Sequence, residues 1–84
     1  MARGPRGLTP QKGLGKAIRL LREEAEVTQV ALAHESDVSA CWLSRIEHGE
    51  VDPTWATVNR LSKGLGVSME SVAERAEWFE QMDA

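Results

Sequence analysis

The chain has 84 residues, of which 42% are apolar and 27% charged, a composition typical of one small globular domain with a modest core. Its single cysteine excludes an internal disulfide framework and fits the cytoplasm, and no apolar run approaches the roughly 20 residues of a membrane span. The formal net charge of −3 argues against general affinity for phosphate unless basic residues are concentrated in one segment.

Basic residues are concentrated at the amino-terminal end. Residues 1–22 contain no acid and six basic side chains, which are Arg3, Arg6, Lys12, Lys16, Arg19 and Arg22. We expect residues 1–9, which are rich in Gly, Arg and Pro, to form a flexible basic arm, and residues 10–84 to form one domain. Arg3, Arg6 and Lys12 are candidate DNA contacts of this arm. A solvated tail without a role is an equal alternative.

The first predicted helix starts at Thr9-Pro10, because Thr can cap a helix and Pro at its first position loses no hydrogen bond. Gly13 and Gly15 weaken its first turns. Apolar residues then recur at a spacing of three or four, which predicts one buried stripe formed by Leu14, Ala17, Ile18, Leu21 and Ala25.

Two short helices are predicted next, within a helix-turn-helix over about residues 28–49. Thr28 can cap the first, which runs from about 29 to 36, and Ser39 can cap the second, which runs from about 40 to 48. Asp37 tolerates the left-handed backbone that the tight turn needs, and Gly49 stands where the second helix ends.

Two more helices complete an all-α fold of five helices. Thr54 caps the fourth, whose inward stripe is predicted to be Trp55, Val58, Leu61 and Leu65, and Gly66 ends it. Ser68 opens the fifth, over about residues 69–82, which is predicted to bury Met69, Val72, Ala76 and Phe79.

The ordered motifs of this chain resemble those of the lambda repressor/Cro-type (XRE) helix-turn-helix regulators. The matching residues are Gln29, Leu32-Ala33, Val38-Ser39, Leu43-Ser44-Arg45-Ile46-Glu47 and Gly49, with Ile18 to Glu24 before them and Pro53-Thr54, Val58, Leu61 and Leu65 to Ser68 after them. The resemblance covers most of the chain and implies a compact, lambda-repressor-like DNA-binding domain. Two positions depart from it, since the family usually has an apolar residue at Ser36 and Gly at Asp37, which predicts a slightly looser turn.

The resemblance also implies roles for individual residues. Arg22 and Glu47 match a partly buried structural ion pair between the first and third helices. Gln29 matches a residue that binds a DNA phosphate and braces the reading helix. With Val38, Leu43 and Ile46 turned inward, the outward, DNA-facing residues of the reading helix are Ser39, Ala40, Cys41, Trp42, Ser44 and Arg45.

Arg45 is the strongest candidate reader, because a bidentate contact from Arg to guanine discriminates well between bases. The alternative for Arg45 is an exposed side chain, or one paired with a neighbouring acid. Ala40 and Cys41 offer only small apolar contacts. Trp42 either donates its indole N–H to a phosphate or packs against helix two or the Val51 loop, and the two are equally favoured.

The acids Glu50 and Asp52 stand where relatives often have basic residues or Asn, and they either weaken DNA binding or mark a loop that stays clear of DNA.

An exposed Cys41 thiol on the reading helix raises the idea of a redox switch, but an ordinary small side chain is favoured because only Arg45 lies near it. His34, His48 and Cys41 do not have the spacing of a metal-ligand cluster, and no phosphate loop or activated nucleophile is present. We therefore expect no cofactor, no metal and no enzymatic activity.

A homodimer is expected, because one copy reads only half of a two-fold site. The predicted dimer seam lies on the fifth helix and consists of Trp78, Phe79 and Met82; the alternative is that Trp78 folds back over its own domain. The sequence thus predicts a cytoplasmic transcriptional regulator, a repressor, that binds double-stranded operator DNA. The alternative is a protein-interaction module or antitoxin-like adaptor that keeps the fold but binds DNA weakly.

Overall fold

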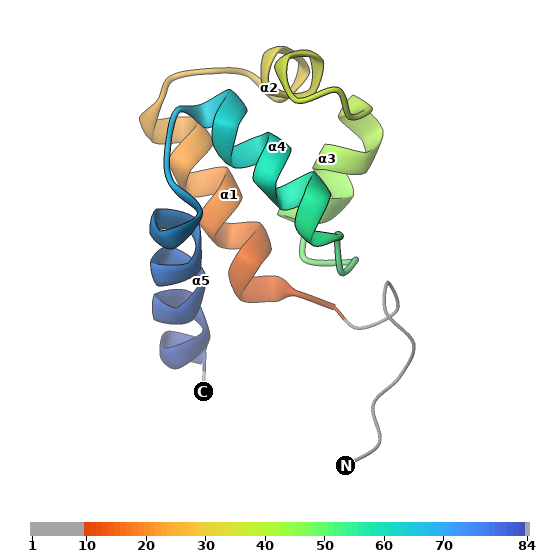
Figure 1. Ribbon diagram of the computed structural model, residues 1–84. Coiled ribbons are helices and arrows are strands. Elements are labelled where there is room, and N and C mark those ends of the chain that lie inside the picture. The colour runs from red at the N-terminus through yellow and green to blue at the C-terminus, as the bar shows by residue number, and fades with distance from the viewer. Residues whose placement is uncertain (1–9, 84) are drawn as a thin grey trace.

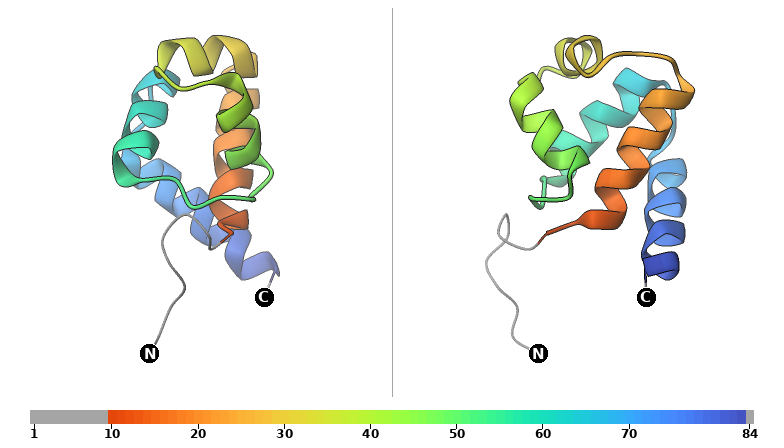
Figure 2. Two further views of the ribbon diagram at one scale, coloured as in Figure 1. Left: turned by 90° about the vertical axis from the view of Figure 1, so that its right-hand side faces the viewer. Right: turned by 180° about the vertical axis from the view of Figure 1, so that it is seen from behind.

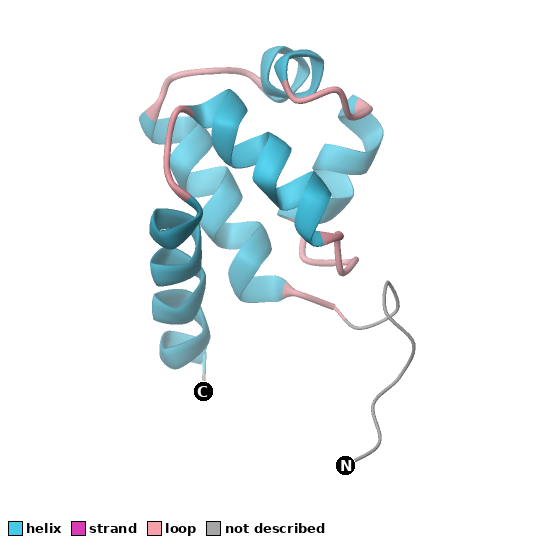
Figure 3. Ribbon diagram, in the orientation of Figure 1, coloured by secondary structure: helices cyan, strands magenta, loops and turns pink. Residues whose placement is uncertain are grey.

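The computed structural model describes residues 10–83, and this part of the chain consists of five α-helices joined by short loops, without a strand (Figure 3). The predicted all-α fold of five helices is confirmed. The helices are α1 (Lys12–Glu24), α2 (Gln29–Glu35), α3 (Ala40–Glu47), α4 (Trp55–Leu65) and α5 (Met69–Asp83).

The helices enclose one apolar core. α1 and α5 lie side by side and antiparallel at one edge of the molecule, α3 lies at the other edge, and α2 covers one end (Figures 1 and 2). α4 faces α1 and α3 from the other side of the core and contacts α2, α5 and α1 (Figure 2). The core is a single cluster that draws on all five helices, and its most deeply buried large residues are Ile18, Leu43, Ile46, Leu61 and Val72.

Four of the five helices begin at the caps that the sequence predicts. Each of these side-chain hydroxyls accepts a hydrogen bond from the amide three residues later, so that a donor of the first turn is satisfied locally. The pairs are Thr28 with Ala31 (3.1 Å), Ser39 with Trp42 (3.0 Å), Thr54 with Thr57 (3.2 Å) and Ser68 with Ser71 (3.1 Å).

The predicted turn chemistry is also present. Asp37 has a left-handed backbone (φ 55°) after α2, and the following amide, of Val38, donates to the carbonyl of Ala33 at 3.0 Å. Gly49 and Gly66 take the same left-handed conformation after α3 and α4. The reversal at Asp37 directs α3 away from α2, and the two helices form the helix-turn-helix.

The start of α1 differs from the prediction. The helix begins at Lys12, two residues after Pro10, and its N-cap residue Gln11 makes no side-chain capping bond; Thr9 lies outside the described residues. Gly13 and Gly15, which are buried, explain this. A Cβ on Gly15 would overlap the carbonyl oxygens of Ile46 and Glu47, so close approach to α3 sets the position of this turn.

Two predicted core residues are exposed. Ala25 is exposed because it follows the last residue of α1, where the stripe has already ended. Trp55 is 71% exposed, because it is the first residue of α4 and lies at the edge of the stripe that Val58 and Leu61 continue. Within the predicted stripe of α5, Val72 is buried whereas Met69, Ala76 and Phe79 are half-buried.

Ser36, where the family usually has an apolar residue, is only 2% exposed. Its hydroxyl has no hydrogen-bond partner among the described residues and faces Gly64 of α4, where a Cβ would lie 2.5 Å from it. A small residue therefore fits at both positions, and α2 and α4 pack closely there.

Candidate nucleic-acid interface

The outward face of α3 carries the residues that the sequence assigns to DNA. Ser39, Cys41 and Arg45 are exposed, whereas Ser44 is half-buried. The predicted outward position of Ala40 needs correction: its side chain is half-buried and packs against the core. The reason is its spacing, since Ala40 lies three residues before the buried Leu43 and shares its side of the helix.

For Trp42, the structure supports the alternative that its side chain packs against the protein. Its side chain is half-buried and packs against the core, as the packing alternative predicts. Arg45 lies over one face of the ring, with its guanidinium carbon 5.4 Å from the ring centroid. Trp42 therefore supports the side chain of Arg45.

Arg45 is held between two neighbours. Besides the Trp42 ring, its Nε lies 3.7 Å from a carboxylate oxygen of Glu50 in the loop that follows α3. Both side chains of this pair remain about half exposed, at 51% and 55%, so the pairing is weak and solvent-screened. The guanidinium is thus oriented on the outward face of α3 and can still exchange the carboxylate for another acceptor.

A buried carboxylate fixes α3 against the rest of the fold. Glu47, whose side chain is 2% exposed, accepts hydrogen bonds from Nε and Nη2 of Arg22 at 2.7 and 3.1 Å. Arg22 also donates to the carbonyl oxygen of Val27 at 2.9 Å. The hydrogen bond with Glu47 raises the pKa of Arg22 above its ordinary value, although burial opposes the shift. Arg22 and Glu47 thus form the ion pair between α1 and α3 that the family resemblance implies.

Gln29, the first residue of α2, joins the same network. Its Nε2 donates to Oε1 of Glu47 at 2.9 Å, which ties the start of α2 to the end of α3. The amide group has a second N–H and a carbonyl oxygen beyond this bond. The position of Gln29 is therefore compatible both with bracing α3 and with contacting a phosphate.

A small polar cleft of about 190 Å³ opens beside this network. Sequence reasoning missed two of its lining residues, Arg19 and His48, although each is one helical turn from a residue it did identify, Arg22 and Ser44. Nδ1 of His48 lies 2.7 Å from the carbonyl oxygen of Ser44, so Nδ1 carries the hydrogen, because a carbonyl only accepts. With Gln29 and Ser44 also in its wall, the cleft is lined by hydrogen-bonding groups of α1, α2 and α3.

The remaining predicted site residues lie elsewhere. Lys12 is exposed and sits against Gly49 at the end of α3, while Arg3 and Arg6 lie outside the described residues. On α5, Trp78 and Met82 are 52% and 63% exposed. Phe79 is half-buried, and its ring meets that of Trp78 edge-on with centroids 5.0 Å apart.

Within residues 10–83, no group of three or more His, Cys, Asp or Glu side chains is arranged to hold a metal ion. None of the helices in the same range is long and apolar enough to cross a membrane. Cys41 has a free, exposed thiol.

Comparisons with known proteins agree with this arrangement. Residues 14–78 match the family described as a helix-turn-helix domain. The HTH-type transcriptional repressor RghR of Bacillus subtilis (strain 168) is 36% identical over 72 residues, which are 84% of this chain and 53% of that protein. The chain spans about half the length of the curated relatives it matches, 53% of RghR and 41% of an immunity repressor protein of Bacillus phage phi105.

Two solved structures share the fold. The clp gene regulator ClgR from Corynebacterium glutamicum superposes with a TM-score of 0.85 at 29% identity, over 94% of this chain and 83% of that one. The wild-type restriction-modification controller protein C.Esp1396I gives a TM-score of 0.73 at 27% identity, over 79% of this chain and 86% of that one. The chain therefore belongs to the helix-turn-helix domain family, and within it to the XRE-like regulators that its sequence resembles.

Proposed function

We propose that this protein is a sequence-specific DNA-binding transcriptional regulator, acting in the cytoplasm as a repressor without enzymatic activity. It binds a two-fold symmetric operator as a homodimer, and α3 of each copy enters a major groove. The similarity of this chain to a transcriptional repressor, a gene regulator and a controller protein supports this proposal.

The observation that carries the proposal is that Arg45 is already oriented on the outward face of α3, and that α3 is held in place by other helices. Arg45 projects from the outward face of α3 and is stacked on Trp42, so a bidentate contact with guanine costs little additional ordering. Behind it, Glu47 clamps the end of α3 to α1 and α2. An exposed reader on a rigid helix is the arrangement that base recognition requires.

Phosphate contacts position the helix in this proposal. Gln29 and the polar cleft beside it offer donors to one phosphate, next to the start of α2. Residues 1–9 serve as a basic arm, to which Arg3 and Arg6 contribute their charge. Because the basic residues are concentrated in this part of the chain, the local charge can favour DNA although the total is −3.

The test is a selection of DNA fragments by the purified protein, with Arg45→Ala compared with the wild type. We expect the wild type to enrich a two-fold symmetric site, with half-sites roughly 34–36 Å apart, and Arg45→Ala to lose preference at one base pair or more in each half. Arg60→Ala, which removes the same charge from an exposed position of α4, is the matched control and retains the preference.

Absence of enrichment by the wild type at moderate salt contradicts the proposal and favours the alternative, a protein-interaction module that binds DNA weakly. Glu50, whose carboxylate competes for Arg45, is the observation on the side of that alternative. Equal selection by wild type and Arg45→Ala would instead remove Arg45 from the reading face while leaving DNA binding intact.

A further inference from the structure

Glu50 is placed beside Arg45 by the way in which α3 ends. Gly49, with a left-handed backbone (φ 73°), reverses the chain, and its amide donates to the carbonyl oxygen of Ile46 at 3.0 Å. The next amide, of Glu50, donates to the carbonyl oxygen of Arg45 itself at 3.1 Å. In a helix end of this kind, the two residues that share the second bond commonly have neighbouring side chains. The backbone therefore brings a carboxylate next to Arg45.

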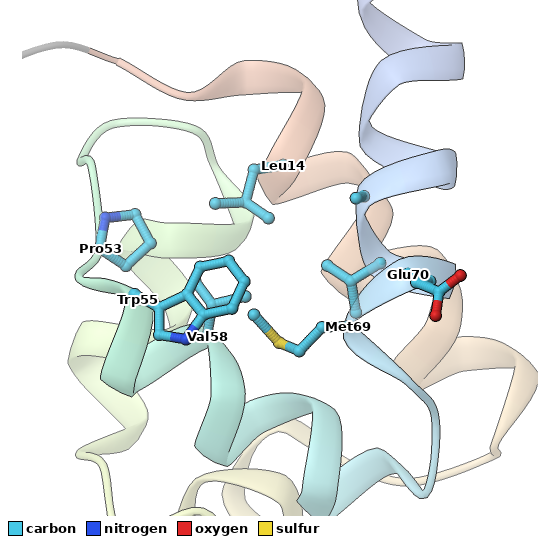
Figure 4. A pocket seen from close by; sticks show the side chains of 8 residues that line it. Leu14, Pro53, Trp55, Val58, Met69 and Glu70 are labelled. Atoms are coloured by element: carbon cyan, nitrogen blue, oxygen red, sulfur yellow. The ribbon is translucent and has the colours of Figure 1, made fainter.

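The loop that follows Glu50 is held against the domain. Val51 is 2% exposed and belongs to the core. Pro53 is also buried, and it lines an apolar groove together with Trp55, as Figure 4 shows. Because the chain is anchored on both sides of Glu50, its carboxylate can move only by rotation about the bonds of its own side chain. Glu50 is therefore a permanent neighbour of Arg45.

The guanidinium of Arg45 has one face and one edge occupied. The Trp42 ring covers the face, and a carboxylate oxygen of Glu50 lies 3.7 Å from the edge at Nε. No described residue accepts a hydrogen bond from Nη1 or Nη2. These two nitrogens form a planar fork, which can donate two parallel hydrogen bonds to O6 and N7 of guanine. Glu50 thus competes for one edge of the guanidinium and leaves open the edge that can read guanine.

The same carboxylate makes a phosphate a poorer partner for Arg45. A phosphate contact from this side chain would strengthen binding to every DNA sequence alike. The negative charge of Glu50 repels the full charge of a phosphate more strongly than the partial charges on the edge of a guanine. Where the groove of the DNA excludes water, the attraction between the carboxylate and Nε also becomes stronger than in the free protein. Both effects favour a guanine contact over a phosphate contact.

We propose that Glu50 is a specificity-determining residue, which holds the Nε edge of Arg45 so that Nη1 and Nη2 meet guanine. It acts through Arg45 and is therefore a positioning residue. The inference rests on the proposed function, because it concerns how the same helix distinguishes an operator from other DNA. It gives a role to an acid whose charge, taken alone, weakens DNA binding.

The test compares Glu50→Gln with the wild type on a modified operator. At the base pair where Arg45→Ala loses preference, guanine is replaced by 7-deazaguanine, which has a C–H group in place of N7. We expect this replacement to weaken wild-type binding about tenfold, because it removes half of the bidentate contact. It should weaken binding of Glu50→Gln about threefold or less, because an Arg45 that is no longer oriented contributes less to the contact. Affinity of Glu50→Gln for a scrambled duplex should rise, and fluorescence anisotropy measures all these affinities.

Asp52→Asn is the matched control, because it removes the same charge from the same loop and should keep the tenfold loss of the wild type. Circular dichroism checks that both variants fold. Equal losses on 7-deazaguanine for the wild type and Glu50→Gln overturn the inference alone, and Glu50 is then only a charge that weakens DNA binding. A reduced loss in Asp52→Asn overturns it too, since any acid of the loop would then have the same effect. A wild type that enriches no site contradicts the proposed function and the inference together.

Discussion

Glu47 is the residue through which α1, α2 and α3 are held together. Its carboxylate accepts three hydrogen bonds from Arg22 and Gln29 while its side chain is 2% exposed. The pKa of Arg22 is raised mainly by this hydrogen bond, so the folded state binds the proton more tightly than the unfolded state. The resulting stability is present below the unfolded pKa of Arg22 and is lost only as pH rises through the folded value, in the strongly alkaline range.

Replacing Glu47 by Gln should therefore destabilise the protein at neutral pH. The substitution keeps the shape but leaves the guanidinium of Arg22 partly buried without a counter-charge, and removing one partner of a buried pair costs about 3 kcal/mol or more. Urea unfolding measures the change. The control is Glu23→Gln, which breaks the exposed pair with Arg19 (60% and 53% exposed) and should cost less than about 1 kcal/mol. Equal losses for the two variants would contradict this account.

The contacts of a residue could be predicted from the sequence where its partners are close in the chain, or where the residue belongs to a known motif. The Arg22–Glu47 pair joins positions 25 apart in sequence, and only the family resemblance named it. Spacing placed Arg45 on the outward face of α3, and a pairing with a neighbouring acid was one alternative for it. The sequence could not show that this acid is Glu50, nor that Arg45 stacks on Trp42. Trp55 was misassigned because the first residue of a helix can continue an apolar stripe without having anything to cover it.

At the scale of whole helices, the residues next to a helix end predicted where most helices begin. The caps at Thr28, Ser39, Thr54 and Ser68 depend only on a hydroxyl and the next turn of backbone, so sequence alone located four helix starts. The start of α1 depends instead on contacts with α3 and α5, and the local Thr-Pro signal did not determine it.

Gly15 shows how such a contact acts on an element. We expect Gly15→Ala to destabilise the protein by about 2 kcal/mol, even though Ala favours helix formation, because the new methyl group overlaps backbone carbonyls of α3. Thermal or urea unfolding gives the loss, and amide chemical shifts show whether α3 moves.

Gly66→Ala is the matched control for this prediction. Its φ of 74° also makes Ala unfavourable, but no atom lies within 4 Å of the added methyl group. Both variants should lose stability, and only Gly15→Ala should shift the amides of Ile46 to Gly49. Unchanged α3 resonances in Gly15→Ala would contradict this account, because a methyl group that overlaps the carbonyls of Ile46 and Glu47 must change the surroundings of the neighbouring amides.

The whole molecule divides its charge and its apolar surface between different faces. Lys12, Arg19 and Arg22 of α1 adjoin the end of α3. The acids Glu70, Glu74, Glu77 and Glu80 lie on α5. The apolar groove lined by Trp55, Val58 and Met69 includes none of the outward residues of α3. A net charge of −3 is then compatible with DNA binding, because these four acids lie on α5 and the acid of α3, Glu47, is buried.

Salt dependence tests the role of the basic arm in this arrangement. Each phosphate contact that is lost should flatten the plot of log K against log salt concentration by about 0.9, because fewer counterions are released on binding. Arg3→Ser combined with Arg6→Ser should therefore reduce the slope by about 2 for each copy and weaken binding to all DNA sequences alike. Fluorescence anisotropy on the selected operator and on a scrambled duplex measures both effects. Arg60→Ser combined with Lys63→Ser removes the same charge from exposed positions of α4 and should change the slope much less. Equal flattening by the two double variants would show that the arm contributes only to the overall field of the protein and touches no phosphate.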